Sequence, residues 1–212
     1  MSLTRNVVTK LKLVVYDHIL SRAVFGYNKK PKSYHDNDFK SGKWDYLASE
    51  SEKLRYTNII AFYREFKPNG SILDIGCGQG VLYKYMSEEF PQLAKSFTGI
   101  DISSAAIQMA RKEFPDVDFQ TMNYDEEKPD QKYDVVIFNE TLYYLAWPMK
   151  TLKKSFDNLN PDGIVIVSMH DYHGRNNRIW KQIERNYSIL ASKKEAVNKG
   201  KMVWDAKVLR QR

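Results

Sequence analysis

Cysteine is almost missing from this chain, since Cys77 is the only one among 212 residues. A single cysteine excludes an intrachain disulfide and any metal site built from several cysteines. It also favours a reducing compartment, so we expect a cytoplasmic protein. No stretch approaches the roughly 20 consecutive apolar residues of a membrane span. Charged side chains interrupt residues 1–25, which therefore lack the continuous apolar core of a secretion signal.

A strong excess of one charge is also missing, because 33 basic residues face 26 acidic ones and give a net charge of +7. The basic residues concentrate at both ends: residues 1–43 have a balance of +6 and residues 171–212 a balance of +7, whereas the middle is acidic. Basic ends can steer an anionic partner such as nucleic acid. They lack the interleaved aromatic residues typical of single-strand binding, which disfavours nucleic acid without excluding it.

The remaining composition is that of a folded domain, with 42% hydrophobic and 28% charged residues. Helical spacing of apolar residues predicts helices over residues 4–24, 44–66, 80–89, 103–114, 148–159 and 175–190. Short apolar runs predict strands over residues 71–75, 97–101, 117–120, 133–138, 164–168, 194–197 and 201–209. Polar residues and Pro31 predict a loop over residues 26–43, and turns are expected at residues 160–163 and 198–200.

Alternating strands and helices predict an α/β fold, a doubly wound and mostly parallel seven-stranded sheet with an N-terminal helical extension. Such sheets bind ligands at the carboxyl ends of their strands, beside the point where the strand order reverses. Functional residues are therefore expected directly after each strand.

The strongest motif follows the first predicted strand, in the segment Leu73-Asp74-Ile75-Gly76-Cys77-Gly78-Gln79-Gly80. Its glycines let the backbone turn tightly and approach a ligand, and the next helix begins with free N–H groups. The spacing differs from the G-x-G-x-x-G of dinucleotide sites, which disfavours an oxidoreductase. A carboxylate at Asp74 would repel a pyrophosphate but suits a ligand with a positive amino group, and it would be costly to bury without a partner.

At this motif the chain resembles the class I S-adenosylmethionine-dependent methyltransferases. The resemblance covers residues 44–210 and is specific at Ile72–Gly80, Gly99–Ile107, Phe119–Asp125 and Tyr133–Leu145. It implies a Rossmann-like methyltransferase domain over residues 44–212 and S-adenosylmethionine as the cofactor. It also assigns five residues to the methionine part of the cofactor: Asp74, Gly76, Cys77, Gly78 and Gly80.

Further cofactor contacts are implied after the next two strands. Asp101 ends the second strand, where a carboxylate can accept hydrogen bonds from the ribose hydroxyls, and Ile102 would lie against adenine. Asn123 stands where the family usually has an aspartate, and its side-chain oxygen can still accept a hydrogen bond from the adenine amino group. Tyr124 would offer its backbone N–H.

Two more residues complete the implied cofactor set. Arg55 is similar to the arginine with which some small-molecule O-methyltransferases grip the cofactor's carboxylate, a role that suits its fork of donors. A solvated arginine on the helix surface is the alternative interpretation. Asn139 follows the fourth strand and is expected to contact the cofactor as well.

The chemistry is expected in the segment Phe138–Leu145, which faces the transferred methyl group in this family. The segment lacks the N/D-P-P-Y/F pattern of enzymes that methylate nucleobase amino groups. It resembles small-molecule O- and N-methyltransferases, including nodulation-type N-methyltransferases with similar Leu-Tyr-Tyr-Leu segments. A base is needed only where the acceptor must lose a proton. The candidate catalytic residues are Glu140, Tyr143 and His170, with His173 as a further candidate base, and no cluster of acids and histidines suggests a metal.

Residues 1–43 lie outside the resemblance. Such extensions often form a lid in the family, so residues 27–43, with Tyr34 and His35, are a possible lid over the acceptor. A docked helix followed by a surface loop is the alternative. The favoured function is methyl transfer to an oxygen or nitrogen of a small molecule. An RNA or protein methyltransferase steered by the basic ends, and a non-catalytic S-adenosylmethionine-binding accessory protein, are the alternative functions.

Overall fold

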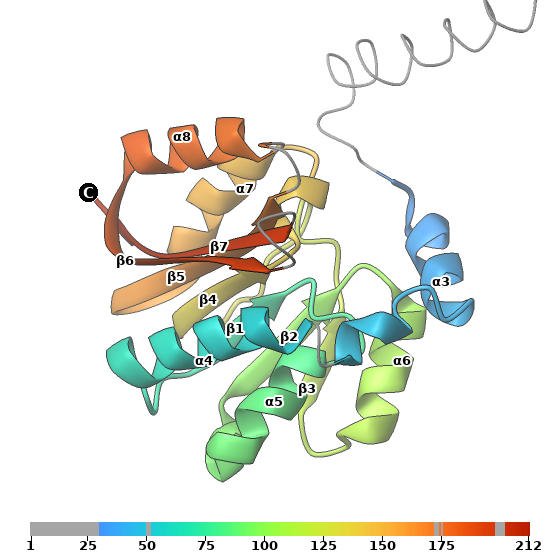
Figure 1. The fold of residues 1–212 in the computed structure, drawn as a ribbon. Helices are drawn as coiled ribbons and strands as arrows, with labels where there is room; N and C mark the ends of the chain where they lie inside the picture. The colour runs from blue at the N-terminus through green and yellow to red at the C-terminus, as the bar shows by residue number, and fades with distance from the viewer. Residues whose placement is uncertain (1–29, 50–51, 172–173, 175, 198–201) are drawn as a thin grey trace, which may run out of the picture.

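The computed structural model describes residues 30–49, 52–171, 174, 176–197 and 202–212. The helix predicted over residues 4–24, the turn predicted at 198–200 and the candidate base His173 lie outside the described residues. The described part forms one sheet with helices packed on both of its faces (Figure 1).

The sheet has seven strands in the order β3-β2-β1-β4-β5-β7-β6. Their bounds are β1 (Ile72–Ile75), β2 (Phe97–Asp101), β3 (Asp118–Thr121), β4 (Tyr133–Asn139), β5 (Leu159–Asp171), β6 (Tyr187–Val197) and β7 (Met202–Gln211). Strands β1 to β5 pair in parallel, and β7 lies antiparallel between β5 and β6. The predicted doubly wound, mostly parallel sheet is confirmed, and its strand order reverses between β1 and β4.

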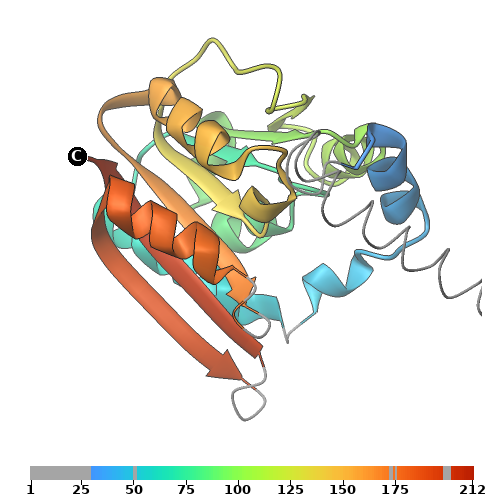
Figure 2. The same ribbon diagram turned by 90° about the horizontal axis from the view of Figure 1, so that it is seen from above.

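The helices divide between the two faces of the sheet (Figures 1 and 2). Their bounds are α3 (Lys32–Lys40), α4 (Lys53–Phe66), α5 (Val81–Glu89), α6 (Ser104–Glu113), α7 (Pro148–Ser155) and α8 (Asn177–Asn186). Helices α4, α5 and α6 pack on one face, and α7 and α8 pack on the other.

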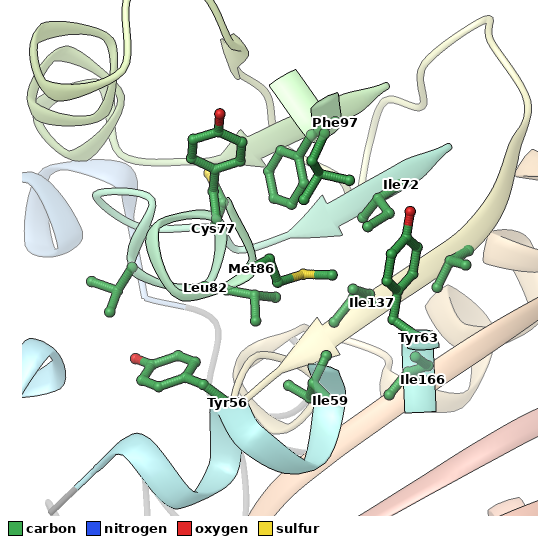
Figure 3. Close-up of a cluster of buried hydrophobic side chains, with 14 of the residues drawn as sticks. Tyr56, Ile59, Tyr63, Ile72, Cys77, Leu82, Met86, Phe97, Ile137 and Ile166 are labelled. Atoms are coloured by element: carbon green, nitrogen blue, oxygen red, sulfur yellow. The ribbon is translucent and has the colours of Figure 1, made fainter. Parts of the chain in front are cut away.

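The strands at the centre of the sheet are apolar on both faces because helices cover both. On the first face, Ile72, Ile137 and Ile166 meet Ile59 of α4 and Met86 of α5 (Figure 3). The alternate strand residues, such as Val136 and Val165, face the second cluster with α7 and α8. This alternation fixes the pairing register, since a slip by one residue would exchange the two faces. The strand ends beside the ligand side are therefore held rigidly.

The loop predicted over residues 26–43 is wrong in its second half, because Lys32–Lys40 forms α3. Pro31 has an extended conformation directly before the helix and suits its start. The polar composition concealed the helix, since Phe39 is the only buried residue in it. Helix α3 packs against α6 rather than on the sheet, as both ribbon views show (Figures 1 and 2).

Other predicted bounds also need correction. The helix predicted from residue 44 begins at Lys53, and a short 3-10 helix, η2 (Asp45–Ala48), precedes it. The helix predicted to residue 190 ends at Asn186, because residues from Tyr187 onwards pair with β7 as β6. The turn predicted at residues 160–163 lies within β5, where Asp162 has a φ of 62° and the register with β4 shifts. That irregularity is a local break in the strand rather than its start.

Candidate active site

A cavity of about 710 Å³ lies at the carboxyl ends of the central strands. The end of β1, the glycine loop after it, and the ends of β2, β4 and β5 contribute to its wall. Of the sequence-predicted site residues, thirteen line the cavity: Arg55, Asp74, Gly76, Cys77, Gly78, Asp101, Ile102, Asn123, Tyr124, Asn139, Glu140, Tyr143 and His170. Gly80 does not line it.

The glycine loop after β1 is fixed by its own backbone. The N–H groups of Gly76 and Cys77 both donate to the carbonyl of Ile100 in β2, at 2.7 and 3.0 Å. Gly76 has a φ of 78°, and a Cβ at this position would lie 2.3 Å from Oγ1 of Thr141. Only glycine allows this backbone conformation and this close approach together. The loop therefore lies directly against the segment that follows β4.

Asp101 joins the glycine loop to the start of α6. Its buried carboxylate accepts the N–H of Gly78 at Oδ2 (2.9 Å) and the N–H of Ser103 at Oδ1 (2.8 Å). Burial raises the pKa of Asp101, while these two hydrogen bonds lower it. Each oxygen retains a lone pair, because an ionised carboxylate has about four acceptor positions. The side chain can thus also accept ribose hydroxyls.

Asp74 is buried within β1, and its Oδ1 has no hydrogen-bond partner among the described residues. Burial, and then the nearby charge of Asp101, raise the pKa of Asp74 to about 8. A buried carboxyl without a partner is unfavourable in its charged form, and a cation placed beside it would restore that form. The positive amino group of an amino-acid ligand fits this position.

Arg55 comes from α4 and is buried rather than solvated, which rules out the alternative interpretation from its sequence position. Its Nη1 lies 3.2 Å from Oε2 of Glu52, and its Nη2 donates to the hydroxyl of Tyr56 at 2.5 Å. Its Nε has no partner among the described residues. A buried guanidinium with an unused donor fits a carboxylate, which accepts from such a fork in the plane of the group.

The segment after β3 lines the cavity with Met122, Asn123, Tyr124 and Asp125. The N–H of Met122 donates to the carbonyl of Asp101 at 2.9 Å, and Oδ1 of Asn123 accepts the N–H of Asp125 at 3.2 Å. The ring of Tyr124 is buried against Phe138, with its hydroxyl bound to Asn158. Its side chain therefore packs in the core, so the part of Tyr124 suited to a ligand is its backbone.

Cys77 and Gly80, two of the predicted cofactor residues, contribute through packing and backbone conformation rather than through a polar side-chain contact. The thiol of Cys77 belongs to the hydrophobic cluster with Leu82 and Phe97 (Figure 3), and burial raises its pKa well above 9.0. Gly80 has a φ of 84°, and a Cβ there would lie 3.1 Å from the ring of Phe119. Gly80 thus lets α5 start close to the aromatic core, which positions the loop before it.

Glu140 follows β4 with a φ of 57°, a left-handed conformation that is uncommon outside glycine. Its Oε2 accepts the hydroxyl of Tyr143 and the backbone N–H of His170, both at 2.8 Å. Its Oε1 is buried and has no partner among the described residues. Burial raises the pKa of Glu140, although the charge of Arg55 and these two hydrogen bonds oppose that shift. The three catalytic candidates are therefore adjacent.

Aromatic rings surround Glu140. The rings of Tyr143 and Tyr144 lie 4.6 Å apart, and the imidazole of His170 packs 5.3 Å from the indole of Trp204 in β7. Tyr46 of η2 also lines the cavity and is 51% exposed, so it stands at the rim. This half of the cavity is lined largely by aromatic rings, with the buried carboxylate of Glu140 among them.

Sequence reasoning predicted a possible lid over residues 27–43 but missed that Lys32–Lys40 is a helix and how this helix docks. Oδ1 of Asp36 accepts the hydroxyl of Ser103 (2.7 Å) and the N–H of Ala105 (3.1 Å), which docks α3 on the start of α6. A Cβ on Gly78 would lie 3.3 Å from the ring of Phe39, so α3 covers the glycine loop. His35 lines the cavity, as a lid would require, whereas Tyr34 does not. No motif around Asp36 indicated this contact.

Two further kinds of feature are absent from the described ranges. None of the helices there is long and apolar enough to span a membrane. Nor do three or more histidine, cysteine, aspartate or glutamate side chains of this part of the chain gather as metal ligands do.

Comparison with known proteins places this cavity in a family. The family model described as a methyltransferase domain matches residues 42–196. Malonyl-[acyl-carrier protein] O-methyltransferase of Acetivibrio thermocellus is 32% identical over 127 residues, which are 59% of this chain and 44% of the relative. Trans-aconitate 2-methyltransferase of Escherichia coli strain 55989 is 32% identical over 100 residues, 47% of this chain and 39% of the relative. The chain thus spans less than half the length of these relatives.

Solved structures share the fold. The N-methyltransferase NodS from Bradyrhizobium japonicum WM9, in complex with S-adenosylhomocysteine, gives a TM-score of 0.65 at 15% identity, over 79% of this chain and 91% of NodS. The plantazolicin methyltransferase BpumL, also in complex with S-adenosylhomocysteine, gives a TM-score of 0.66 at 16% identity. The match covers 96% of this chain and 99% of BpumL. The match of the family model to residues 42–196, on a sheet of this strand order, shows that the chain belongs to the class I S-adenosylmethionine-dependent methyltransferases.

Proposed function

We propose that this methyltransferase transfers the methyl group to an oxygen or nitrogen of a small molecule that enters the same cavity as the cofactor. The observation that carries the proposal is the continuity of one cavity from Asp74 and Asp101 to Glu140 and the tyrosines. Its volume of about 710 Å³ lies within the range of small-molecule sites, roughly 300–1,000 Å³.

The cofactor half supplies complementary groups for each end of an amino-acid nucleoside. Asp74 would bind the amino group and Arg55 the carboxylate, since these are the two buried charged groups with unused hydrogen-bonding atoms there. Asp101 would hold the ribose, and the turn at Asn123 the adenine amino group. The buried Oδ1 of Asn139, which has no partner among the described residues, is a further acceptor beside the glycine loop.

The acceptor half would orient the substrate and exclude water. S-adenosylmethionine supplies a methyl group on a positively charged sulfur, which is already activated for in-line displacement. Holding the acceptor atom in line is then the main task of the chain's residues. Glu140 can accept a proton from the acceptor, and Tyr143 is fixed in place by its hydrogen bond to Glu140. His170 forms part of the wall.

The small size of the acceptor is supported by the lining of the cavity. Lys30 and Arg55 are the only lysine and arginine among its described lining residues, so the basic ends of the chain do not form a phosphate-binding surface around it. The names of the relatives in Acetivibrio thermocellus and Escherichia coli point to a malonyl group and to aconitate as acceptors. No observation favours RNA over such molecules.

The test combines binding with methyl transfer. Calorimetry of S-adenosylhomocysteine measures the cofactor site, and incubation with tritium-labelled S-adenosylmethionine and, in parallel, a metabolite extract, total RNA and total protein measures transfer. Label that passes a small-pore filter in a compound separated by chromatography from S-adenosylmethionine supports the proposal. Label found only in precipitated RNA or protein contradicts the small acceptor. Tight binding without any labelled product favours the accessory protein.

A further inference from the structure

Carboxylates outnumber basic groups in the lining of the cavity. Two basic side chains, Lys30 and Arg55, stand among the described lining residues. The acidic ones are Glu52, Asp74, Asp101, Asp125 and Glu140. Nearby charges interact strongly in such a partly buried site because the effective dielectric constant is lower than in water. The cavity is therefore suited to a positively charged ligand over and above the cofactor.

Most of these carboxylates already have partners. Asp101 accepts two backbone N–H groups, and Asp125 accepts the N–H of Ala146 and the hydroxyl of Thr151, both at 3.0 Å. Glu52 pairs with Arg55. Asp74 and Glu140 remain as the two whose buried oxygens have no partner in the described part of the chain.

These two carboxylates belong to different halves of the cavity. Asp74 lies in β1 immediately before the glycine loop, where the cofactor's amino group fits. Glu140 lies beyond the loop, after β4, and is hydrogen-bonded to Tyr143 and to the backbone of β5. The cofactor therefore accounts for Asp74 and leaves Oε1 of Glu140 for another ligand.

The rings near Glu140 reinforce its preference for a cation. Tyr143 donates its hydroxyl to Glu140 at 2.8 Å, the ring of Tyr144 lies 4.6 Å from that of Tyr143, and Tyr46 lines the same cavity. The face of an aromatic ring attracts a cation within about 6 Å by its quadrupole.

We propose that the acceptor is a primary or secondary amine, which binds as its ammonium form against Oε1 of Glu140 between the rings of Tyr46, Tyr143 and Tyr144. This inference rests on the proposed function and narrows it to N-methylation. An acceptor carboxylate would instead face the charge of Glu140, because Arg55 pairs with Glu52 and its unused Nε is assigned to the carboxylate of the cofactor. The acceptor chemistry thus differs from that named for the malonyl and aconitate relatives.

The transfer then balances without a further reactant. The ammonium donates one proton to the Glu140 carboxylate, giving a neutral amine and a carboxylic acid. The nitrogen lone pair forms the new bond to the methyl carbon while the sulfur–carbon bond breaks, and that electron pair stays on sulfur as a thioether. The methylated product leaves as an ammonium, and Glu140 releases its proton to solvent. Burial of Glu140 favours the first step, because it makes the carboxylate a stronger base.

The first experiment measures binding rather than turnover. Phenethylamine, 2-phenylethanol and phenylacetate share one ring and differ in charge, and each is titrated into the protein saturated with S-adenosylhomocysteine. We expect phenethylamine, as its ammonium, to bind at least tenfold more tightly than the alcohol, and phenylacetate to bind most weakly. Equal affinities, or tightest binding of phenylacetate, would overturn the amine assignment.

A pair of variants tests the role of Glu140 directly. Glu140→Gln keeps an oxygen for Tyr143 and His170 but removes the charge, so the preference for phenethylamine should fall below threefold. Glu113→Gln removes an exposed carboxylate that pairs with Lys84 at the surface, and should leave the preference unchanged. An unchanged preference in Glu140→Gln contradicts the proposal. Should this variant fail to fold by circular dichroism, the comparison of the three compounds on the native protein decides.

The second experiment separates this inference from the proposed function. Small labelled products from the metabolite extract are first separated from S-adenosylmethionine by chromatography, then passed over a cation exchanger and treated with mild base. N-methylated amines are retained and stable, whereas methyl esters release labelled methanol and methyl ethers pass through. Retained, base-stable label supports the amine. Label only in esters or ethers leaves the small-molecule function standing and overturns the amine, and absence of any small labelled product contradicts both.

Discussion

The two halves of the cavity are assembled by different means. In the cofactor half, backbone groups of the glycine loop and the ends of neighbouring parallel strands do the positioning, as in the paired N–H groups of Gly76 and Cys77 on Ile100. In the acceptor half, side chains from distant segments meet, such as Tyr46 of η2, Glu140 after β4 and Trp204 of β7. One half follows from a local motif and the other from tertiary packing. A change of acceptor therefore needs no change in the cofactor site.

The largest expected effect is the loss of cofactor affinity when Asp74 is replaced. Asp74→Asn should weaken S-adenosylhomocysteine binding by about 100-fold or more, since it removes the buried partner of a charged amino group. It should not lower the thermal stability of the free protein, because the neutral amide removes an unpartnered buried acid. Calorimetry and thermal unfolding measure the two effects. Asp116→Asn, at an exposed position, is the control, and affinity within threefold of the native value would contradict the assignment.

The second effect is the pH dependence of that same contact. A carboxyl with its pKa raised to about 8 is protonated below that pH, whereas the ligand's ammonium needs the anion. Affinity for S-adenosylhomocysteine should therefore rise with pH by up to about tenfold per unit below pH 8 and then level off. Asp101, Tyr56 and Cys77 are the titratable groups that interact with Asp74.

Calorimetry at pH 6, 7 and 8, in two buffers with different ionisation enthalpies, measures the proton released on binding. Asp74→Asn should show neither the slope nor the proton release. A flat profile in the native protein would mean that Asp74 is already ionised before the ligand arrives.

A smaller effect is expected from the helix that covers the glycine loop. Asp36→Ala removes the acceptor that Ser103 and Ala105 share, so we expect about a fivefold loss of affinity for S-adenosylhomocysteine, equivalent to about 1 kcal/mol. Hydrogen bonds from Lys32, Ser103 and Ala105 outweigh burial and hold the pKa of Asp36 well below its ordinary value, so the contact persists at acidic pH. Asp38→Ala, in the same helix, removes an ion pair with Lys43 instead and serves as the control. Equal losses in the two variants would show a general effect of α3.

The smallest expected effect concerns Cys77 and tests whether its backbone, rather than its thiol, contributes to the cofactor site. Cys77→Ala should leave S-adenosylhomocysteine affinity within about twofold, because the thiol packs in the hydrophobic cluster. The free energy of unfolding should fall by about 1 kcal/mol through the lost packing. Denaturant titration and calorimetry separate the two readouts, and a tenfold loss of affinity would instead make the thiol a ligand contact.

The cofactor half could be predicted from sequence because its determinants are local. The segment from Asp74 to Gly80 contains its own turn, and Asp101 ends the strand that pairs beside it. The fold could be predicted because short apolar strand segments alternate with segments of helical periodicity. The strands are apolar throughout because helices cover both faces of the sheet. These signals lie within single elements, so no knowledge of long-range packing was needed.

The acceptor half was only partly predictable. The contact of Glu140 with His170 depends on the register of β4 with β5, in which Asn139 pairs with Ser168. The position of Trp204 beside His170 depends on antiparallel pairing of β7 with β5. Helix α3 escaped prediction because it docks through the polar contacts of Asp36 and the single buried ring of Phe39 rather than through an apolar stripe. Such determinants appear only when segments far apart in the sequence are brought together.

The antiparallel pair of β6 and β7 is a place where the acceptor specificity could be redesigned. It closes one edge of the sheet and sends Trp204 into the cavity wall, while β4 and β5 stand between it and the glycine loop. Replacing Trp204 with smaller apolar residues would enlarge the space for bulkier substrates without changing Asp74 or Asp101. A library of variants restricted to β6 and β7 would therefore change the acceptor specificity while the cofactor site stays unchanged.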